Sequence, residues 1–207
     1  ASLRQSDMPS PPPSQRLYLS NFNLHSEHLI TMTSNIILID NGHGGETPGK
    51  CSPDGRLREY AWTREIARRV CDKLKALGYD AGLLVPELND VSLRERVRRV
   101  NSVCAGAGSD NVLLVSIHVN AAGTGQWHNA SGWTAWVAPN ASQRSRQLAS
   151  LLNAEAVRLN LKGNRSLEPF FTGNFAILRD TKCPAVLTEN MFQDNSHDVD
   201  YLLSERG

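Results

Sequence analysis

Two histidines and one glutamate stand where three buried strands are expected to end. His43 follows the apolar run of residues 36–40, His118 closes the run of residues 112–117, and Glu189 follows the run of residues 185–188. Runs this rich in Val, Ile and Leu predict strands that are buried in a sheet. Ligands of an open α/β sheet bind beyond the carboxyl ends of its strands, so we expect these side chains to share one rim.

Two imidazoles and one carboxylate are a common ligand set of catalytic zinc, and a second carboxylate beside the metal can act as general base. Glu59, in the first turn of a predicted helix, is the fourth candidate. Alone, His43 could be an exposed loop residue, His118 a hydrogen-bonded core residue, and Glu59 a favourable charge at a helix start. Glu189 needs a partner or a function, because it follows a buried strand. Together the four residues favour a metal site, in which Asp40 or a nearby carbonyl is expected to orient His43.

Four sequence words carry a resemblance to a known family. They are IDNGHGG at residues 39–45, LREY at 57–60, SIHVNA at 116–121 and ILRDTKCPAVLTENMFQDN at 177–195. In this order they resemble the zinc-dependent N-acetylmuramoyl-L-alanine amidases with a catalytic domain of the amidase-3 type. The resemblance covers nearly all of residues 35–207. The family usually has proline where this chain has Asn41, a difference that leaves the register of His43 intact.

The resemblance implies an enzyme that uses one Zn²⁺ ion to cut the amide bond between N-acetylmuramic acid and L-alanine in peptidoglycan. It implies His43, Glu59 and His118 as the zinc ligands and Glu189 as the catalytic carboxylate. Glu189 is then expected to take a proton from the attacking water and to return it to the leaving amine.

Substrate contacts are predicted with less support from spacing. Arg179 stands where the family often has an arginine near the site, and Asn120 closely follows His118. Trp127 and His128 lie in the next loop, where they could line the substrate groove. The simpler interpretation of Trp127 is a surface aromatic that packs locally, and this interpretation is favoured.

The elements between these words alternate between strands and helices. Strands are predicted near residues 35–40, 81–85, 112–118, 132–138, 175–178 and 185–189. Helices are predicted near residues 59–77, 92–104 and 142–159 and from residue 197, and residues 162–173 are predicted to form a loop. Ser92 and Glu95 have the spacing of a capping box. The alternation predicts an α/β fold in a single domain: a mostly parallel, twisted sheet of about six strands with helices on both faces.

The domain is expected to cover residues 33–207, with a last helix truncated at Gly207. Residues 1–32 are interpreted as a leader that is flexible or was added by cloning. They contain SPPPS at residues 10–14 and lack the continuous apolar core of a signal peptide. Without a visible signal, the chain fits a phage lysin made in the cytoplasm or a fragment of an exported autolysin, and the lysin is favoured.

Composition is ordinary for one globular domain of 207 residues, 40% of them hydrophobic. A net charge of +1 implies no bulk attraction to nucleic acid or membrane, and no stretch is apolar enough to span a bilayer. We expect a monomer. Four arginines between residues 94 and 99 are interpreted as a solvated helix face, since Glu95 is interleaved with them.

Four cysteines occur without a CxxC pair, which disfavours a thiolate zinc site. Cys71 and Cys104 are predicted to pack as small apolar residues inside helices. A structural disulfide involving Cys51 or Cys183 stays open, although nothing in the spacing favours one.

Two other functions share parts of this pattern. A zinc peptidase or deacylase that acts on another amide would keep the same metal site. A non-catalytic wall-binding module could keep the fold, but it would have no need for the base that Glu189 supplies.

Overall fold

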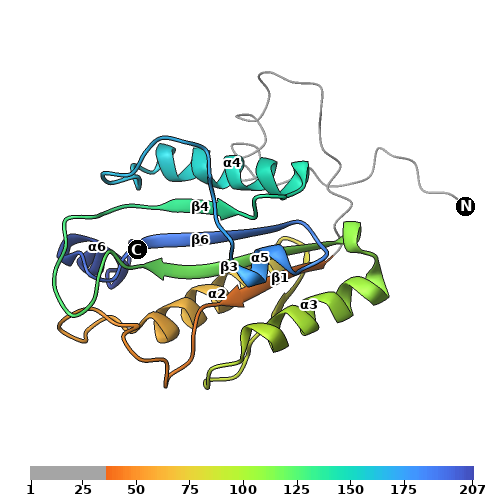
Figure 1. Ribbon diagram of the computed structural model, residues 1–207, viewed down its shortest axis with the longest axis horizontal. Helices are drawn as coiled ribbons and strands as arrows, with labels where there is room; N and C mark the ends of the chain where they lie inside the picture. Colours follow the sequence, from red (N-terminus) through yellow and green to blue (C-terminus); the bar gives the residue numbers. More distant parts are fainter. Residues whose placement is uncertain (1–35) are drawn as a thin grey trace, which may run out of the picture. The chain divides into compact units, whose positions relative to one another are not determined.

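Six strands form one sheet: β1 (Ile36–Asn41), β2 (Asp80–Leu83), β3 (Val112–Asn120), β4 (Thr134–Val137), β5 (Phe171–Thr172) and β6 (Ala185–Phe192). The computed structural model describes residues 36–207, so the predicted leader and Asn35 lie outside the described residues. The strand order is β2-β1-β3-β6-β4-β5 (Figure 1). The first four strands in this order run parallel, whereas β4 is antiparallel to β6. This confirms the predicted mostly parallel sheet.

The strand order places a topological switch between β1 and β3. From β1 the chain moves outward to β2 and then returns past β1 to β3. In open α/β sheets, ligands bind at the carboxyl ends of the strands beside such a switch. The residues that follow β1 and those that end β3 are therefore the first place to look for a functional site.

The helices are α2 (Glu59–Ala76), α3 (Leu93–Ala107), α4 (Gln143–Arg158), α5 (Ala176–Arg179) and α6 (Ser196–Leu202), with a 3₁₀ turn η1 (Ser109–Asn111). Helices α2 and α4 pack against one face of the sheet, and α3 and α5 pack against the other. Figure 1 shows α4 alongside β4. Helices on both faces were predicted, and the structure confirms them.

Alternating side chains of the central strands explain this two-sided packing. Ile37 and Ile39 of β1 join the cluster of α2, whereas Leu38 between them joins the cluster of α3. Each fully buried aliphatic side chain contributes about 1.5–3 kcal/mol relative to an exposed one. The sheet is thus stabilised from both faces.

Helix α3 begins with half of the predicted capping box. The Ser92 hydroxyl accepts a hydrogen bond from the Glu95 amide over 3.3 Å. The Glu95 carboxylate does not return to Ser92; it accepts hydrogen bonds from Arg98 and Arg99 instead. In a complete capping box the Glu95 carboxylate would accept a hydrogen bond from the Ser92 amide. Here it pairs with arginines one turn along the helix instead.

One predicted strand is wrong. Residues 175–178 were expected to form a strand, but Ala176–Arg179 is the short helix α5. Strand β5 (Phe171–Thr172) forms instead, inside the segment that was predicted to be a loop. Its Phe171 pairs with Trp136 of β4. An apolar run of four residues suits either structure. Here Phe171–Thr172 pairs with β4, and Ile177 and Leu178 pack into the core from the short helix.

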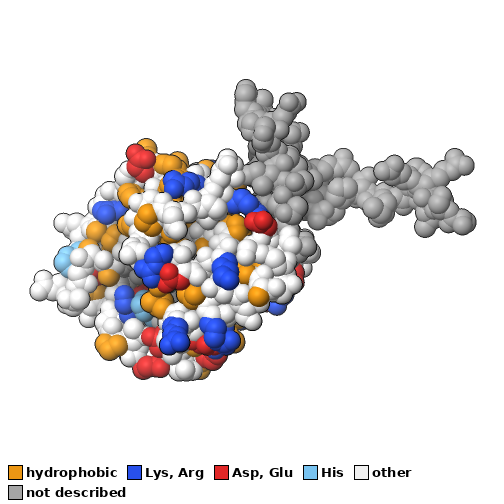
Figure 2. Space-filling view, turned by 45° about the vertical axis from the view of Figure 1, so that its right-hand side comes forward, with side chains coloured by type: hydrophobic (Ala, Val, Ile, Leu, Met, Phe, Trp, Pro, Cys, Tyr) orange, Lys and Arg blue, Asp and Glu red, His pale blue; other side chains and the backbone are white. Residues whose placement is uncertain are grey.

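Cys71 and Cys104 are buried inside α2 and α3, as predicted. All four cysteines, which lie in the described part of the chain, are free, and Cys71 and Cys104 are each 3% exposed. Figure 2 shows acidic and basic side chains interspersed over the face that it presents. Among the helices of residues 36–207, none combines the length and apolar character needed to cross a membrane.

Candidate metal centre

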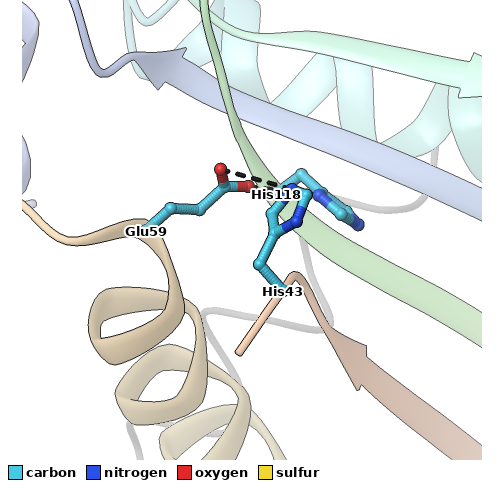
Figure 3. A group of neighbouring side chains, drawn as sticks. All are labelled: His43, Glu59 and His118. Atoms are coloured by element: carbon cyan, nitrogen blue, oxygen red, sulfur yellow. Dashed lines mark hydrogen bonds and ion pairs between the residues drawn. The ribbon is translucent and has the colours of Figure 1, made fainter. Parts of the chain in front are cut away.

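Three side chains from distant segments meet at the carboxyl ends of β1 and β3 (Figure 3). His43 lies in the loop after β1, Glu59 is the first residue of α2, and His118 lies near the end of β3. One nitrogen or oxygen atom of each lies within 4.8 Å of those of the other two. The rings of His43 and His118 stand edge to face, with centroids 5.2 Å apart. The structure thus brings three of the predicted site residues together.

Glu59 joins the two histidines. Its Oε1 accepts a hydrogen bond from the Val119 amide over 3.0 Å and lies 3.1 Å from Nδ1 of His118. Its Oε2 lies 3.5 Å from Nε2 of His43, but it is buried and has no hydrogen-bond partner among the described residues. An unsatisfied buried polar atom costs about 1–3 kcal/mol. A cation held between this oxygen and the two imidazoles would remove that cost, so the residues present fit a metal ion.

The surroundings shift the pKa values of the two histidines in opposite directions. Burial lowers the pKa of His43 to about 4; Glu59 opposes this shift and His118 adds to it. Burial also acts to lower the pKa of His118, but the hydrogen bond to Glu59 and the charge of Glu189 outweigh it and raise the pKa overall. His43 is therefore neutral near pH 7, the state in which imidazole binds metals.

The Glu59 carboxylate is held in its charged form. Burial alone would raise its pKa, but the hydrogen bond and charge of His118 outweigh burial, so the pKa of Glu59 is lowered. An ionised carboxylate beside two imidazole nitrogens suits divalent metals that accept both oxygen and nitrogen ligands.

Backbone geometry leaves little freedom around this group. A Cβ atom on Gly42 would lie 2.6 Å from Nδ1 of His118 and 3.1 Å from Oε1 of Glu59, so only glycine fits there. His43 itself has a φ of 58°, in the left-handed region. For a residue other than glycine this conformation costs on the order of 1–2 kcal/mol. Contacts around the loop must therefore hold His43 in place.

Glu189 lies beside this group on β6. It is the register partner of His118 on β3, so the two side chains emerge on the same face of the sheet. Its Oε2 is buried and finds no hydrogen-bond partner within residues 36–207. Burial raises the pKa of Glu189 to about 7, with His118 opposing the shift and Glu59 adding to it. A carboxyl group with this pKa can both accept and return a proton near neutral pH.

The strand pairing becomes irregular directly after this pair. The next register partners are Asn120 and Phe192, so β6 contains one residue more than β3 over this interval. Met191, inside the interval, has a φ of 67°. Such a bulge bends its strand and redirects the neighbouring side chains, and bulges are frequent next to active sites.

Asp40 does not meet the His43 ring as the sequence suggested. Its two carboxylate oxygens accept hydrogen bonds from Arg96 and from the Ser116 hydroxyl, at 2.7 and 2.6 Å. Arg96 is 3% exposed, so the prediction of a solvated arginine face is wrong for this residue. The prediction holds for Arg98, whose side chain is 67% exposed.

A signal for the burial of Arg96 is present in the sequence. Arg96 precedes Val100 and Cys104 by four and eight residues, so it shares their helical stripe, and both are in the core. The prediction of a solvated face relied instead on Glu95, which lies among the arginines.

Three of the predicted substrate contacts lie at the end of β3 and in the loop that follows it. The Asn120 side chain, at the end of β3, accepts a hydrogen bond from the Ala121 amide. Trp127 is 43% exposed, and the His128 amide donates to the Asp194 carbonyl. These loop residues stay candidates for substrate binding.

Arg179 is not brought to the metal group. Its guanidinium donates to Asp180 and Asn174. It lines a cavity of about 220 Å³ together with Pro184 and Ala185, at the amino end of β6. Glu189 lies toward the other end of that strand, so Arg179 lies away from the metal group.

Comparisons with known proteins give one consistent family. The sequence profile described as N-acetylmuramoyl-L-alanine amidase matches residues 37–207. The chain is 32% identical to N-acetylmuramoyl-L-alanine amidase CwlM of Bacillus licheniformis, covering 81% of this chain and 60% of that protein. It is 26% identical to the endolysin of Bacillus phage SPP1, covering 80% of this chain and 58% of that protein. The chain therefore spans about three fifths of the length of these curated relatives.

A solved structure shows the same fold. The crystal structure of N-acetylmuramoyl-L-alanine amidase from Clostridium difficile 630 matches with a TM-score of 0.69 and 26% identity. The match covers 84% of this chain and 88% of that one.

Proposed function

The chain belongs to the N-acetylmuramoyl-L-alanine amidase family, and we propose from this premise that it is a zinc-dependent peptidoglycan hydrolase. The bond that it cuts joins the lactyl group of N-acetylmuramic acid to L-alanine. One observation carries the proposal: His43, Glu59 and His118 converge on one point, and Glu189 lies on the adjacent strand.

His43, Glu59 and His118 would hold the zinc ion, with one carboxylate oxygen and two imidazole nitrogens as donors. When bound, zinc lowers the pKa of a water molecule to about 7 and polarises an amide carbonyl. Three protein ligands that leave a further position for water or substrate are typical of catalytic zinc sites. Oε2 of Glu59, which is buried without a hydrogen-bond partner among the described residues, supports this assignment.

Glu189 serves as the proton carrier. It accepts a proton from the water that attacks the amide carbonyl, and it donates this proton to the amide nitrogen as the C–N bond breaks. The products are a lactyl carboxylate on the glycan and the α-ammonium group of L-alanine, which also takes up the second proton of the water. A raised pKa suits both transfers, because neither protonation state of Glu189 is strongly favoured near neutral pH.

Two observations favour this enzyme over a binding module. A binding module has no use for a buried carboxylate with an elevated pKa beside a metal group, yet Glu189 has both properties. Burying such a group without a partner is costly unless a function requires it. A peptidase or deacylase would share this site, so product chemistry must separate these activities.

Mass spectrometry of digested peptidoglycan tests the proposal. Purified wall treated with the protein should release stem peptides that begin with free L-alanine and leave glycan strands with free lactyl groups. A chelator should stop the reaction, and added zinc should restore it. Cleaved cross-links or new reducing ends, without free lactyl groups, would assign another activity.

The site of action would be the bacterial cell wall. Relatives include a phage endolysin and a bacterial amidase. A phage lysin and a part of an exported autolysin both fit the catalytic proposal.

A further inference from the structure

We propose that Arg96 is a positioning residue of the metal centre, which holds the loop carrying His43 in the conformation that presents its imidazole to Glu59 and His118. This inference rests on the proposed metal-dependent function. Arg96 lies on α3, 53 residues after His43, and it contacts none of the three candidate ligand side chains in the hydrogen bonds found among residues 36–207.

The Arg96 guanidinium is buried, and each of its nitrogens donates at least one hydrogen bond. The Arg96 side chain is 4% exposed, and its three nitrogens make five hydrogen bonds. The acceptors are Val91 O (2.7 Å), Asp40 Oδ1 (2.7 Å), Asn41 O (2.5 Å), His43 O (3.3 Å) and Asp90 Oδ1 (3.3 Å). Two of these acceptors are backbone carbonyls that flank Gly42. The planar fork of arginine can bind several acceptors at fixed angles.

The same contacts connect β1, which leads into the loop of His43, to β3, which carries His118. Asp40 of β1 and Ser116 of β3 are register partners, and the Ser116 hydroxyl donates to Asp40 Oδ2. Arg96 donates to the other oxygen of Asp40. The guanidinium is therefore fixed to the end of β1 through Asp40, and through Ser116 to the strand that carries His118.

The loop needs such support because of its backbone conformation. His43 has a φ of 58°, which a non-glycine residue rarely adopts unless its surroundings impose it. Three successive carbonyls are held: Arg96 binds those of Asn41 and His43, and the Thr63 hydroxyl binds that of Gly42 between them. The Gly42 amide also donates to the Ile117 carbonyl of β3 over 2.9 Å. Arg96 supplies two of these restraints from a single side chain.

The experiment measures zinc affinity on the full chain, starting from metal-free protein, by competition with a chromophoric chelator. Arg96→Lys keeps a positive charge beside Asp40 but loses the fork that reaches both carbonyls. A paired variant, Asp40→Asn with Arg96→Met, removes both buried charges together and leaves neither one orphaned. Arg98→Met, on the exposed side of the same helix, is the matched control.

Both Arg96 variants should bind zinc about 10- to 100-fold more weakly than wild type, as is usual when a residue that supports a metal ligand is removed. Arg98→Met should bind as wild type does. Thermal unfolding of the metal-free proteins is measured separately, because a purely structural role would lower the melting temperature and leave zinc affinity at lower temperature unchanged. Should the paired variant fail to fold, Arg96→Lys alone decides.

Wild-type zinc affinity in folded Arg96→Lys overturns the inference and leaves the proposed function intact. Wild-type protein that binds no zinc overturns the proposed function itself. Amide hydrogen exchange gives a readout without metal: the amides of Gly44 and Gly45 should exchange faster in Arg96→Lys than in Arg98→Met. Equal exchange in the two variants would contradict a positioning role.

Discussion

Glu189 and His118 lie side by side on neighbouring parallel strands, although 71 residues separate them in the chain. Each changes the proton affinity of the other: Glu189 helps to raise the pKa of His118, and His118 opposes the rise in the pKa of Glu189. The candidate base and a candidate metal ligand are thus coupled through one strand pair. A change at either position is expected to affect both proton transfer and metal binding, but to different degrees.

Replacement of Glu189 by glutamine should abolish turnover and leave zinc bound. The amide has the shape of the carboxylate but cannot carry the proton, so kcat should fall by about 10²- to 10⁴-fold. Muropeptide release and zinc content by elemental analysis are measured on the same preparation. Arg179→Ala, in α5 near the amino end of β6, should retain wild-type activity. Turnover by Glu189→Gln at the wild-type rate would remove Glu189 from the mechanism.

His43→Ala and His118→Ala should each lose the metal. Either substitution leaves two of the three donors, and the remaining pair holds zinc too weakly to survive purification. Zinc per chain is measured by elemental analysis, with His197→Ala as the control because His197 is exposed on α6. Stoichiometric zinc in His43→Ala or in His118→Ala would contradict the ligand assignment.

Gly42→Ala should disable the site with little change in the rest of the fold. The added methyl group would lie 2.6 Å from Nδ1 of His118, so the imidazole must move. A displacement of about 1 Å can lower activity about 100-fold. Gly45→Ala is a matched control in the same loop, because its Cβ would meet nothing closer than 3.5 Å. Similar zinc affinity and activity in the two variants would show that the space beside Gly42 is not critical.

Zinc binding near neutral pH should release a proton from His118 and none from His43. The pKa of His118 is raised above its usual 6.5 in the metal-free protein, so part of the population is protonated and must lose that proton to bind metal. The pKa of His43 is about 4, so this ring is already neutral. Apparent zinc affinity should therefore rise with pH until the pKa of His118 is passed. Calorimetry in two buffers with different ionisation enthalpies measures the proton release, and identical heats would count against this assignment.

The local sequence determined the fold class and most of the candidate site. Three runs of Val, Ile and Leu predict strands whatever surrounds them, because such runs must be buried. Parallel strands end at one rim, so His43, His118 and Glu189 could be brought together from their positions alone. Glu59 was added by the resemblance to the amidase family. Taken alone, a glutamate at the start of a helix is explained by its favourable interaction with the helix dipole.

Tertiary structure decided those features that depend on contacts with residues distant in the chain. Residues 171–172 become a strand because β4 offers an edge, and residues 176–179 become a helix that packs beneath the sheet. Arg96 is charged and stands among exposed arginines, yet it is buried because Asp40 and two loop carbonyls lie within its reach. The cost of burying a charge depends on acceptors contributed by other elements, and no local pattern records where those acceptors will be.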